Sequence, residues 1–109
     1  MSKLVFVDIE TTGLISGYHE IIEIAIIDES GTHYHAKIKP KRLQLADVRA
    51  LTLNCYSAKS WKNALEPVQA AHEISEMLKG CTIVAHNPHF DMPFIEELLH
   101  EHQVDYNSV

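Results

Sequence analysis

The sequence predicts an α/β domain built around a mixed β-sheet, and two observations carry this prediction. Three stretches of strand type come first and are separated by turn sequences, so they pair as antiparallel neighbours. A helix, a fourth strand and a second helix follow, and a strand reached through a helical crossover lies parallel to its neighbour. We therefore expect three antiparallel strands, with the fourth strand parallel to the first.

Each of the first three strands has its own pattern. Residues 3–8 are largely apolar, which indicates a strand buried on both faces. Residues 20–27 are rich in β-branched side chains, and the turn sequence of residues 28–31 follows them. Residues 32–39 alternate between apolar and polar side chains until Pro40, which is the pattern of a half-exposed strand. The second and third strands therefore form a hairpin.

The second half of the chain contains two helices on either side of a short strand. Residues 41–64 have a mixed pattern and predict only loop or short helical turns. A helix then starts at Pro67, which suits a first helical turn, and stops at Gly80. A short buried strand is expected over residues 82–85, and the second helix over residues 90–102.

Hydrophobic periodicity predicts which side of each helix is buried. The apolar stripe of the first helix consists of Val68, Ala71, Ile74 and Leu78. The buried side of the second helix consists of Phe94, Ile95, Leu98 and Leu99. We also expect core positions for the aromatic side chains of Phe6, Trp61 and Phe94.

Length and composition restrict the class of protein. A chain of 109 residues with 46% hydrophobic and 22% charged residues has the size and composition of one globular domain. The net charge of −6 argues against broad neutralisation of duplex phosphates, but it allows an enzyme that concentrates acidic groups around metal ions. No apolar run reaches the ~20 residues that cross a bilayer, and Cys55 and Cys81 lack the spacing of a disulfide framework. We therefore expect a cytoplasmic protein.

The most informative feature is the end of the first strand, where two carboxylates precede a Thr-Thr-Gly turn. Asp8 and Glu10 are two positions apart, so in an extended strand their side chains lie on the same face. Two like charges held close together repel, and a buried pair needs a cation between them. Oxygen ligands favour magnesium or manganese over zinc. The sequence therefore predicts a divalent metal site at these two residues.

A third carboxylate follows the fourth strand, in the sequence HNPHFD of residues 86–91. If the fourth strand is parallel to the first, both strands deliver their acids to the same edge of the sheet. Asp91 is then expected to join Asp8 and Glu10. A carboxylate at this position can also stabilise the N-terminus of its helix, and the two roles are compatible.

Other polar residues near these strands have more open interpretations. Glu23 lies in a strand that we expect to be buried, so it needs a partner near the site. His33 and His35 share one strand face, and we interpret them as an edge-strand surface in preference to a metal pair. His86 and His89 flank the third carboxylate, where substrate contact and an ordinary hydrogen-bonding role are both open.

The two carboxylate sequences form a specific double signal. The D-x-E-T-T-G run of residues 8–13 and the H-N-x-x-F-D run of residues 86–91 resemble the first two motifs of the DEDD exonucleases. This DnaQ-like group includes the proofreading epsilon subunit of bacterial DNA polymerase III. The similarity in the type, order and spacing of elements extends over residues 3–103. It implies a ribonuclease H-like fold and a 3′–5′ exonuclease that releases nucleoside 5′-monophosphates from DNA or RNA.

The resemblance also implies a role for individual residues. Two Mg²⁺ or Mn²⁺ ions would be held by Asp8, Glu10 and Asp91 and would support phosphodiester hydrolysis. The 3′-terminal nucleotide would be seated by the backbone around Thr11 and Thr12 and by the side chain of Leu14. Asn87 and Phe90 would help to position the strand. A single-stranded nucleic acid 3′ end and a DNA polymerase subunit are the implied partners.

The chain departs from the family pattern at the fourth acid, which belongs to a third motif on a later helix. His100 and Asp105 match one form of this motif in spacing. However, a helix that continues from Asp91 would place His100 roughly 13 Å along its axis from the metal site, so this match is expected to be coincidental. We therefore expect a single exonuclease-like domain over residues 1–109 that lacks the final strand and helix.

Two functional hypotheses follow from this departure. With three of four acids, the 109-residue chain is expected to cleave weakly or not at all, either as a fragment of a longer enzyme or as a natural short form. The alternative is a catalytically silent module that binds nucleic acid ends or a polymerase partner. Cleavage that depends on a metal ion and on Asp8 would favour the enzyme.

Overall fold

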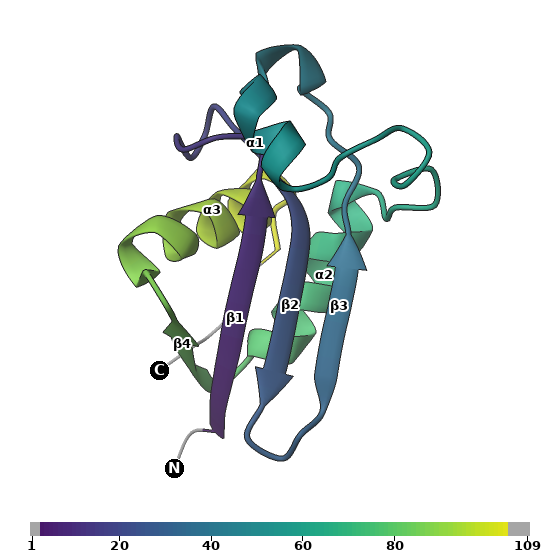
Figure 1. The fold of residues 1–109 in the computed structure, drawn as a ribbon. Helices are drawn as coiled ribbons and strands as arrows, with labels where there is room; N and C mark the ends of the chain where they lie inside the picture. Colours follow the sequence, from purple (N-terminus) through teal and green to yellow (C-terminus); the bar gives the residue numbers. More distant parts are fainter. Residues whose placement is uncertain (1–2, 105–109) are drawn as a thin grey trace.

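Residues 3–104 are described by a computed structural model, in which one β-sheet carries two long helices on one of its faces (Figure 1). The strands are β1 (Lys3–Thr11), β2 (Ile21–Asp28), β3 (His33–Lys37) and β4 (Cys81–Ala85). They lie in the order β3-β2-β1-β4. The pairs β1–β2 and β2–β3 are antiparallel, and β4 is parallel to β1. The predicted mixed sheet is therefore confirmed.

The first strand is longer than the sequence predicts. It continues through the two carboxylates to Thr11, which pairs with Ile21 after an irregularity in register next to Glu10. Such irregularities increase local twist and change the direction of side chains, and they are common beside functional sites. The strand therefore delivers its acids from within the sheet, close to its end.

The helices include two short segments between β3 and the long helices. The helical elements are η1 (Leu43–Leu45), α1 (Val48–Leu53), α2 (Pro67–Leu78) and α3 (Pro88–Glu101). The two short segments confirm the helical turns expected within residues 41–64. Gly80, with a φ of 72°, follows α2 in the left-handed conformation that ends many helices. Within residues 3–104 no helix combines the length and the apolar character needed to cross a membrane.

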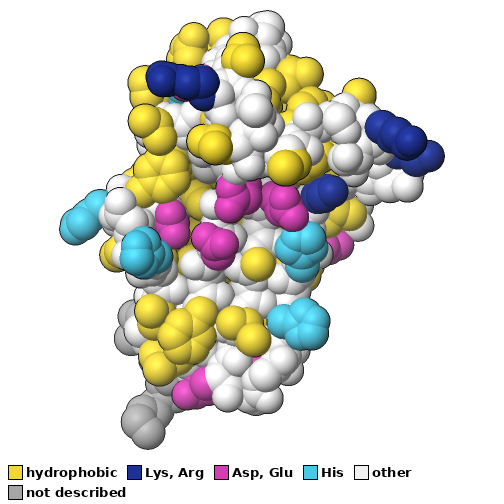
Figure 2. All heavy atoms as spheres, in the orientation of Figure 1, with side chains coloured by type: hydrophobic (Ala, Val, Ile, Leu, Met, Phe, Trp, Pro, Cys, Tyr) yellow, Lys and Arg dark blue, Asp and Glu magenta, His cyan; other side chains and the backbone are white. Residues whose placement is uncertain are grey.

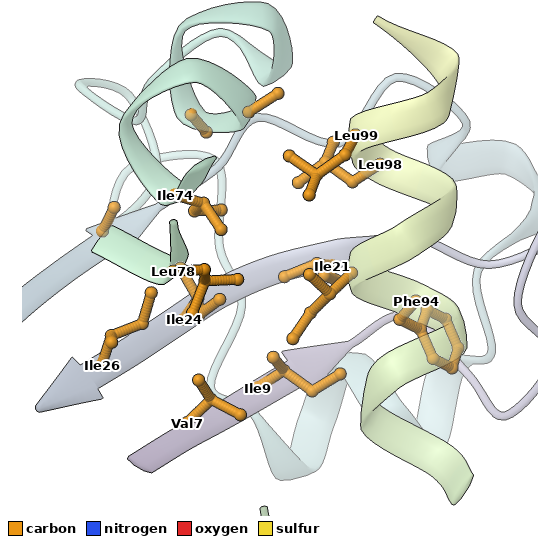
Figure 3. Packing of buried hydrophobic residues seen from close by; sticks show 14 of the residues in the cluster. Val7, Ile9, Ile21, Ile24, Ile26, Ile74, Leu78, Phe94, Leu98 and Leu99 are labelled. Carbon is orange, nitrogen blue, oxygen red and sulfur yellow. The ribbon is translucent and has the colours of Figure 1, made fainter. Parts of the chain in front are cut away.

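The core lies between the sheet and the two long helices (Figure 3). Val7 and Ile9 of β1 and Ile24 of β2 point toward α2 and α3. The helices contribute the buried side chains of Ala70, Ala71, Ile74, Leu78, Phe94, Ile95, Leu98 and Leu99. The predicted buried side of α3 is thus confirmed. For α2 the prediction was wrong at Val68, which is 47% exposed, because the stripe turns toward the sheet at Ala70 instead.

The opposite face of the sheet carries apolar side chains that remain exposed. Phe6 lies beside Ile27 of β2 and Val84 of β4 in one row across the sheet. These three side chains are 43%, 46% and 38% exposed, respectively. The prediction that residues 3–8 are buried on both faces was therefore wrong, as was the core position expected for Phe6. Trp61 is buried, as predicted, and its indole nitrogen donates to the Ile22 carbonyl at 2.9 Å.

Candidate active site

Two acids of β1 lie on the exposed face of the sheet. Asp8 is opposite Ala25 of β2, and Glu10 is opposite Glu23. The intervening Ile9 points into the core on the other face, as the alternation of a strand requires. Figure 2 shows acidic side chains gathered near the middle of this face, with histidines on both sides of them. Asp8 and Glu10 therefore lie on the same face of β1, as the alternation of the strand predicts.

The third acid is placed by the start of α3. Asp91 lies in the first turn of this helix, where its backbone N–H donates to the Asn87 carbonyl at 3.0 Å. Its side chain is buried, with 7% exposed. Burial raises the pKa of the Asp91 carboxyl, and the negative charge of Asp8 raises it further, while His86 acts in the opposite direction. The charge of Asp8, in the first predicted motif, thus acts on the carboxyl group of Asp91, in the second.

Glu10 resembles Asp91 in that its pKa is raised. Burial raises the pKa of Glu10, and the charges of Asp8 and Glu23 add to this increase. The neighbouring carboxylates therefore destabilise the ionised form of Glu10, and a divalent cation would relieve this repulsion. Within residues 3–104 no group of three or more His, Cys, Asp or Glu side chains adopts a geometry that could hold a metal ion. The argument for a cation here therefore depends on the repulsion between the carboxylates and on their oxygen atoms, which Mg²⁺ and Mn²⁺ prefer as ligands.

The Thr-Thr-Gly turn is stabilised by its own hydrogen bonds. The Thr11 hydroxyl donates to the Gly13 carbonyl at 2.6 Å, and the Thr12 hydroxyl accepts from the Glu20 N–H at 3.0 Å. Gly13 is required by packing, because an added Cβ would overlap the His19 ring. The threonine hydroxyls therefore shape the turn, and a contact with substrate here would come from the backbone.

Helix α1 is attached to this turn at both of its ends. The Asp47 N–H donates to the Thr12 carbonyl at 2.8 Å, and the Asn54 amide donates to the Thr11 carbonyl at 2.9 Å. Asp47 also caps α1 by accepting from the Arg49 N–H at 2.9 Å. Hydrophobic periodicity did not predict this helix as part of the site. The N-cap residue was a usable signal for the helix, but not for its position over the turn.

Two adjoining hollows border the acids. The first, of about 300 Å³, is lined by Asp8, Glu10, Glu23, His35, Asn54 and neighbouring residues. The second, of about 390 Å³, is lined by Glu10, Thr11, Leu14, Arg49, Asn54, Phe90 and neighbouring residues. Glu10, Leu53 and Asn54 belong to both hollows, so one depression runs past Asp8 and Glu10.

The structure brings many of the predicted site residues to this depression. Leu14 and Phe90 face the second hollow from opposite chain segments, and Leu14 is 78% exposed. Thr12 is buried beneath the turn, and Asn87 is exposed where α3 begins. Of the pair considered for a third motif, His100 lies in the last turn of α3 and Asp105 lies outside the described residues.

Glu23 has the partner that its position in the strand requires. His35 of β3 contacts it through Nε2, with 2.6 Å to the Glu23 carboxylate. This hydrogen-bonded pair lies beside the acids on the exposed face of the sheet, where both side chains line the first hollow. His35 therefore belongs to the site region, in addition to the edge-strand surface that the sequence predicted.

A mixed sheet with acids on β1 and in the first turn of α3, the helix that follows β4, is the arrangement of a ribonuclease H-like domain. A family model described as Exonuclease matches residues 5–107, so the chain belongs to this exonuclease family. The match confirms the family expected from the two motifs, and it identifies the domain as that of a nuclease.

Curated relatives support the same assignment. The chain is 35% identical to a protein of Staphylococcus saprophyticus named 3′-5′ exonuclease DinG, in an alignment that covers 92% of this chain and 11% of the relative. It is 30% identical to the Staphylococcus aureus protein of the same name, with 97% of this chain and 12% of the relative covered. The chain thus spans about a ninth to an eighth of the length of these relatives.

Solved structures share the fold. A product-bound exonuclease I has a TM-score of 0.83 and 18% identity, over 96% of this chain and 27% of that chain. Escherichia coli exonuclease I in complex with a dT13 oligonucleotide has a TM-score of 0.85 and 18% identity, over 96% and 25% of the two chains. At this identity the likeness establishes the ribonuclease H-like fold.

Proposed function

We propose that the chain is a metal-dependent 3′–5′ exonuclease domain that binds single-stranded nucleic acid ends and releases nucleoside 5′-monophosphates. The observation that carries this proposal is the placement of Asp8 and Glu10 on one face of β1, with Asp91 in the first turn of α3, where the charge of Asp8 raises the pKa of both other acids. Partly buried acids whose pKa is raised by a neighbouring carboxylate are costly unless they bind a cation. Membership of the exonuclease family supplies the reaction class.

The proposed metal ligands are Asp8, Glu10 and Asp91, and the ions are Mg²⁺ or Mn²⁺, two in a complete site. Carboxylate oxygens are the donors that these hard ions prefer. The bound ions would activate the attacking water and offset charge on the phosphate. The protein's own contribution is to fix the three carboxylates on rigid elements, β1 and α3, with Asp8 and Glu10 lining the depression that would admit the substrate.

The proposed nucleotide site is the second hollow. Leu14 and Phe90 offer apolar surface to a base or sugar, while the turn at Thr11 and Thr12 approaches with its backbone. Asn87, exposed where α3 begins, would contact the strand. The dT13 complex of exonuclease I supports single-stranded DNA as the substrate class. A DNA polymerase subunit as partner stays a prediction from the resemblance.

Three proposed ligands leave the site one acid short of the family pattern, so we propose slow turnover for the isolated chain. The test is Mn²⁺-dependent release of nucleoside monophosphate from a single-stranded oligonucleotide labelled at either end. We expect slow release from the 3′ end, and its loss in Asp8→Ala. Glu76→Ala, on the exposed side of α2, is the control for a lost acid. Equal activity in Asp8→Ala would contradict the proposal, and metal-independent binding without cleavage would support the silent binding module.

A further inference from the structure

We infer that His35, oriented by Glu23, is a substrate-positioning residue that contacts a backbone phosphate of the bound strand. This inference rests on the proposed function and deepens it. The distance of 2.6 Å between His35 Nε2 and the Glu23 carboxylate fixes one edge of the imidazole ring. The side chain of His35 is nevertheless 55% exposed, so the rest of the ring is accessible to a ligand.

The position of His35 follows from the register of three strands. On the exposed face, His35 lies opposite Ala25, and Ala25 lies opposite Asp8. Alanine is the smallest side chain in this row, so it leaves the space between the histidine and the acid open. Both His35 and Asp8 line the first hollow. A phosphate that approaches the acids over Ala25 would therefore pass beside the imidazole.

Charge makes such a contact useful. The first hollow is lined by three carboxylates, those of Asp8, Glu10 and Glu23, which repel a phosphate in the absence of compensating charge. Of the residues described as lining it, only His35 can carry a positive charge. Lys37, the next residue on this strand face, places its ammonium group 4.3 Å from the centre of the Trp61 ring.

The hydrogen bond to Glu23 determines what the ring can offer. Because the carboxylate accepts from Nε2, the Nδ1 edge is the one left for a phosphate. The doubly protonated ring donates from both nitrogens at once. Glu23 thus acts as the orienting group and His35 as the group that contacts the substrate, which also explains why an acid occupies a partly buried position in β2.

The test measures binding of a short fluorescein-labelled oligothymidylate by anisotropy, with Ca²⁺ and at several salt concentrations. We expect His35→Ala to weaken binding roughly tenfold and to reduce the salt slope by about 0.7, the value of one phosphate contact in single strands. His35→Arg should restore both quantities, which a purely structural role would not do. His33→Ala is the matched control, since His33 lies on the same strand face opposite Ile27 and is not among the residues described as lining the first hollow.

The outcomes separate this inference from the function on which it rests. If the wild type binds and Asp8→Ala loses its response to the metal, but His35→Ala binds with unchanged affinity and salt slope, the role of His35 is wrong and the function stands. A loss in His33→Ala equal to that in His35→Ala would also overturn it. Absence of oligonucleotide binding by the wild type would overturn both.

Discussion

Glu10 of β1 lies directly opposite Glu23 of β2, so two acidic side chains face each other across an antiparallel pair. Like charges in this relationship destabilise a sheet. Glu23 has a hydrogen bond to His35, whereas Glu10 has the carboxylates of Asp8 and Glu23 as neighbours. Burial and these two charges raise the pKa of Glu10. This arrangement costs stability in the free protein, which is typical of a site that binds a cation.

The first prediction concerns the pH dependence of stability. Because the folded state raises the pKa of Glu10 above its ordinary value of 4.5, it binds the proton more tightly than the unfolded chain does. The free energy of unfolding should therefore decrease as the pH rises from about 4.5 through the raised pKa of Glu10. Glu10→Gln removes the charge and should be more stable than the wild type above this pKa, with little difference at pH values below 4.5. Urea unfolding in metal-free buffer measures both.

Asp28 provides a control of opposite sign. Its pKa is lowered, mainly by the hydrogen bond from the Ser30 hydroxyl at 2.6 Å, so its contribution to stability is present at neutral pH and is lost on acidification. Asp28→Asn should therefore be less stable than the wild type at neutral pH and approach it in acid. The same direction of change in both variants would contradict the assignment of repulsion at Glu10.

The second prediction concerns the connection between β3 and α2. The Tyr34 hydroxyl donates to Glu73 at 2.7 Å, and burial together with this bond raises the pKa of Tyr34. Tyr34→Phe should lower the free energy of unfolding by about 1–2 kcal/mol. Gln69→Ala removes an exposed hydrogen bond to the same carboxylate and should cost less than about 0.5 kcal/mol. Equal losses of free energy of unfolding in urea would show that the partly buried Tyr34–Glu73 hydrogen bond contributes no more than the exposed Gln69–Glu73 bond.

The third prediction concerns the exposed face of the sheet. Phe6 is 43% exposed, whereas Ile24 is fully buried between the sheet and the helices. Phe6→Gln should change the free energy of unfolding by less than about 1 kcal/mol, and Ile24→Ala should lower it by about 2–5 kcal/mol. Thermal unfolding of the two variants gives the comparison. A large loss in Phe6→Gln would mean that this face is covered in solution.

The fourth prediction concerns the turn that carries the site. Gly13→Ala places a methyl group where the His19 ring lies, and should cost about 1–3 kcal/mol. His19→Ala removes the ring and should make Gly13→Ala less costly in the double variant. Strictly additive losses in a double-mutant cycle of urea unfolding would refute direct contact between these positions.

The main features of the fold were predictable because they depend on local sequence. The turn after β2 and the helix before β4 determine the antiparallel and parallel pairings. The error at Phe6 has a different cause, since an apolar strand has the same sequence whether or not a second layer covers it. Its true exposure depends on which elements pack against that face, and this is a property of the whole fold.

The placement of the proposed ligands was also predictable, because Asp8 and Glu10 share a strand face and Asp91 lies in the first turn of the helix that follows β4, the strand parallel to β1. The role of Asn54 was not. It depends on a tertiary hydrogen bond from a six-residue helix to the Thr11 carbonyl, for which periodicity gives no signal. The contact between Glu23 and His35 likewise needs the register of two strands.

Calorimetric titration of Mn²⁺ tests whether Asp8, Glu10 and Asp91 form one divalent metal site. We expect the wild type to bind Mn²⁺ and Glu10→Ala to lose this binding, while Glu76→Ala retains it. Asp8→Ala and Asp91→Ala should behave as Glu10→Ala does. Binding of Mn²⁺ that is equally strong in Glu10→Ala and Glu76→Ala, or no binding by the wild type, would contradict this site.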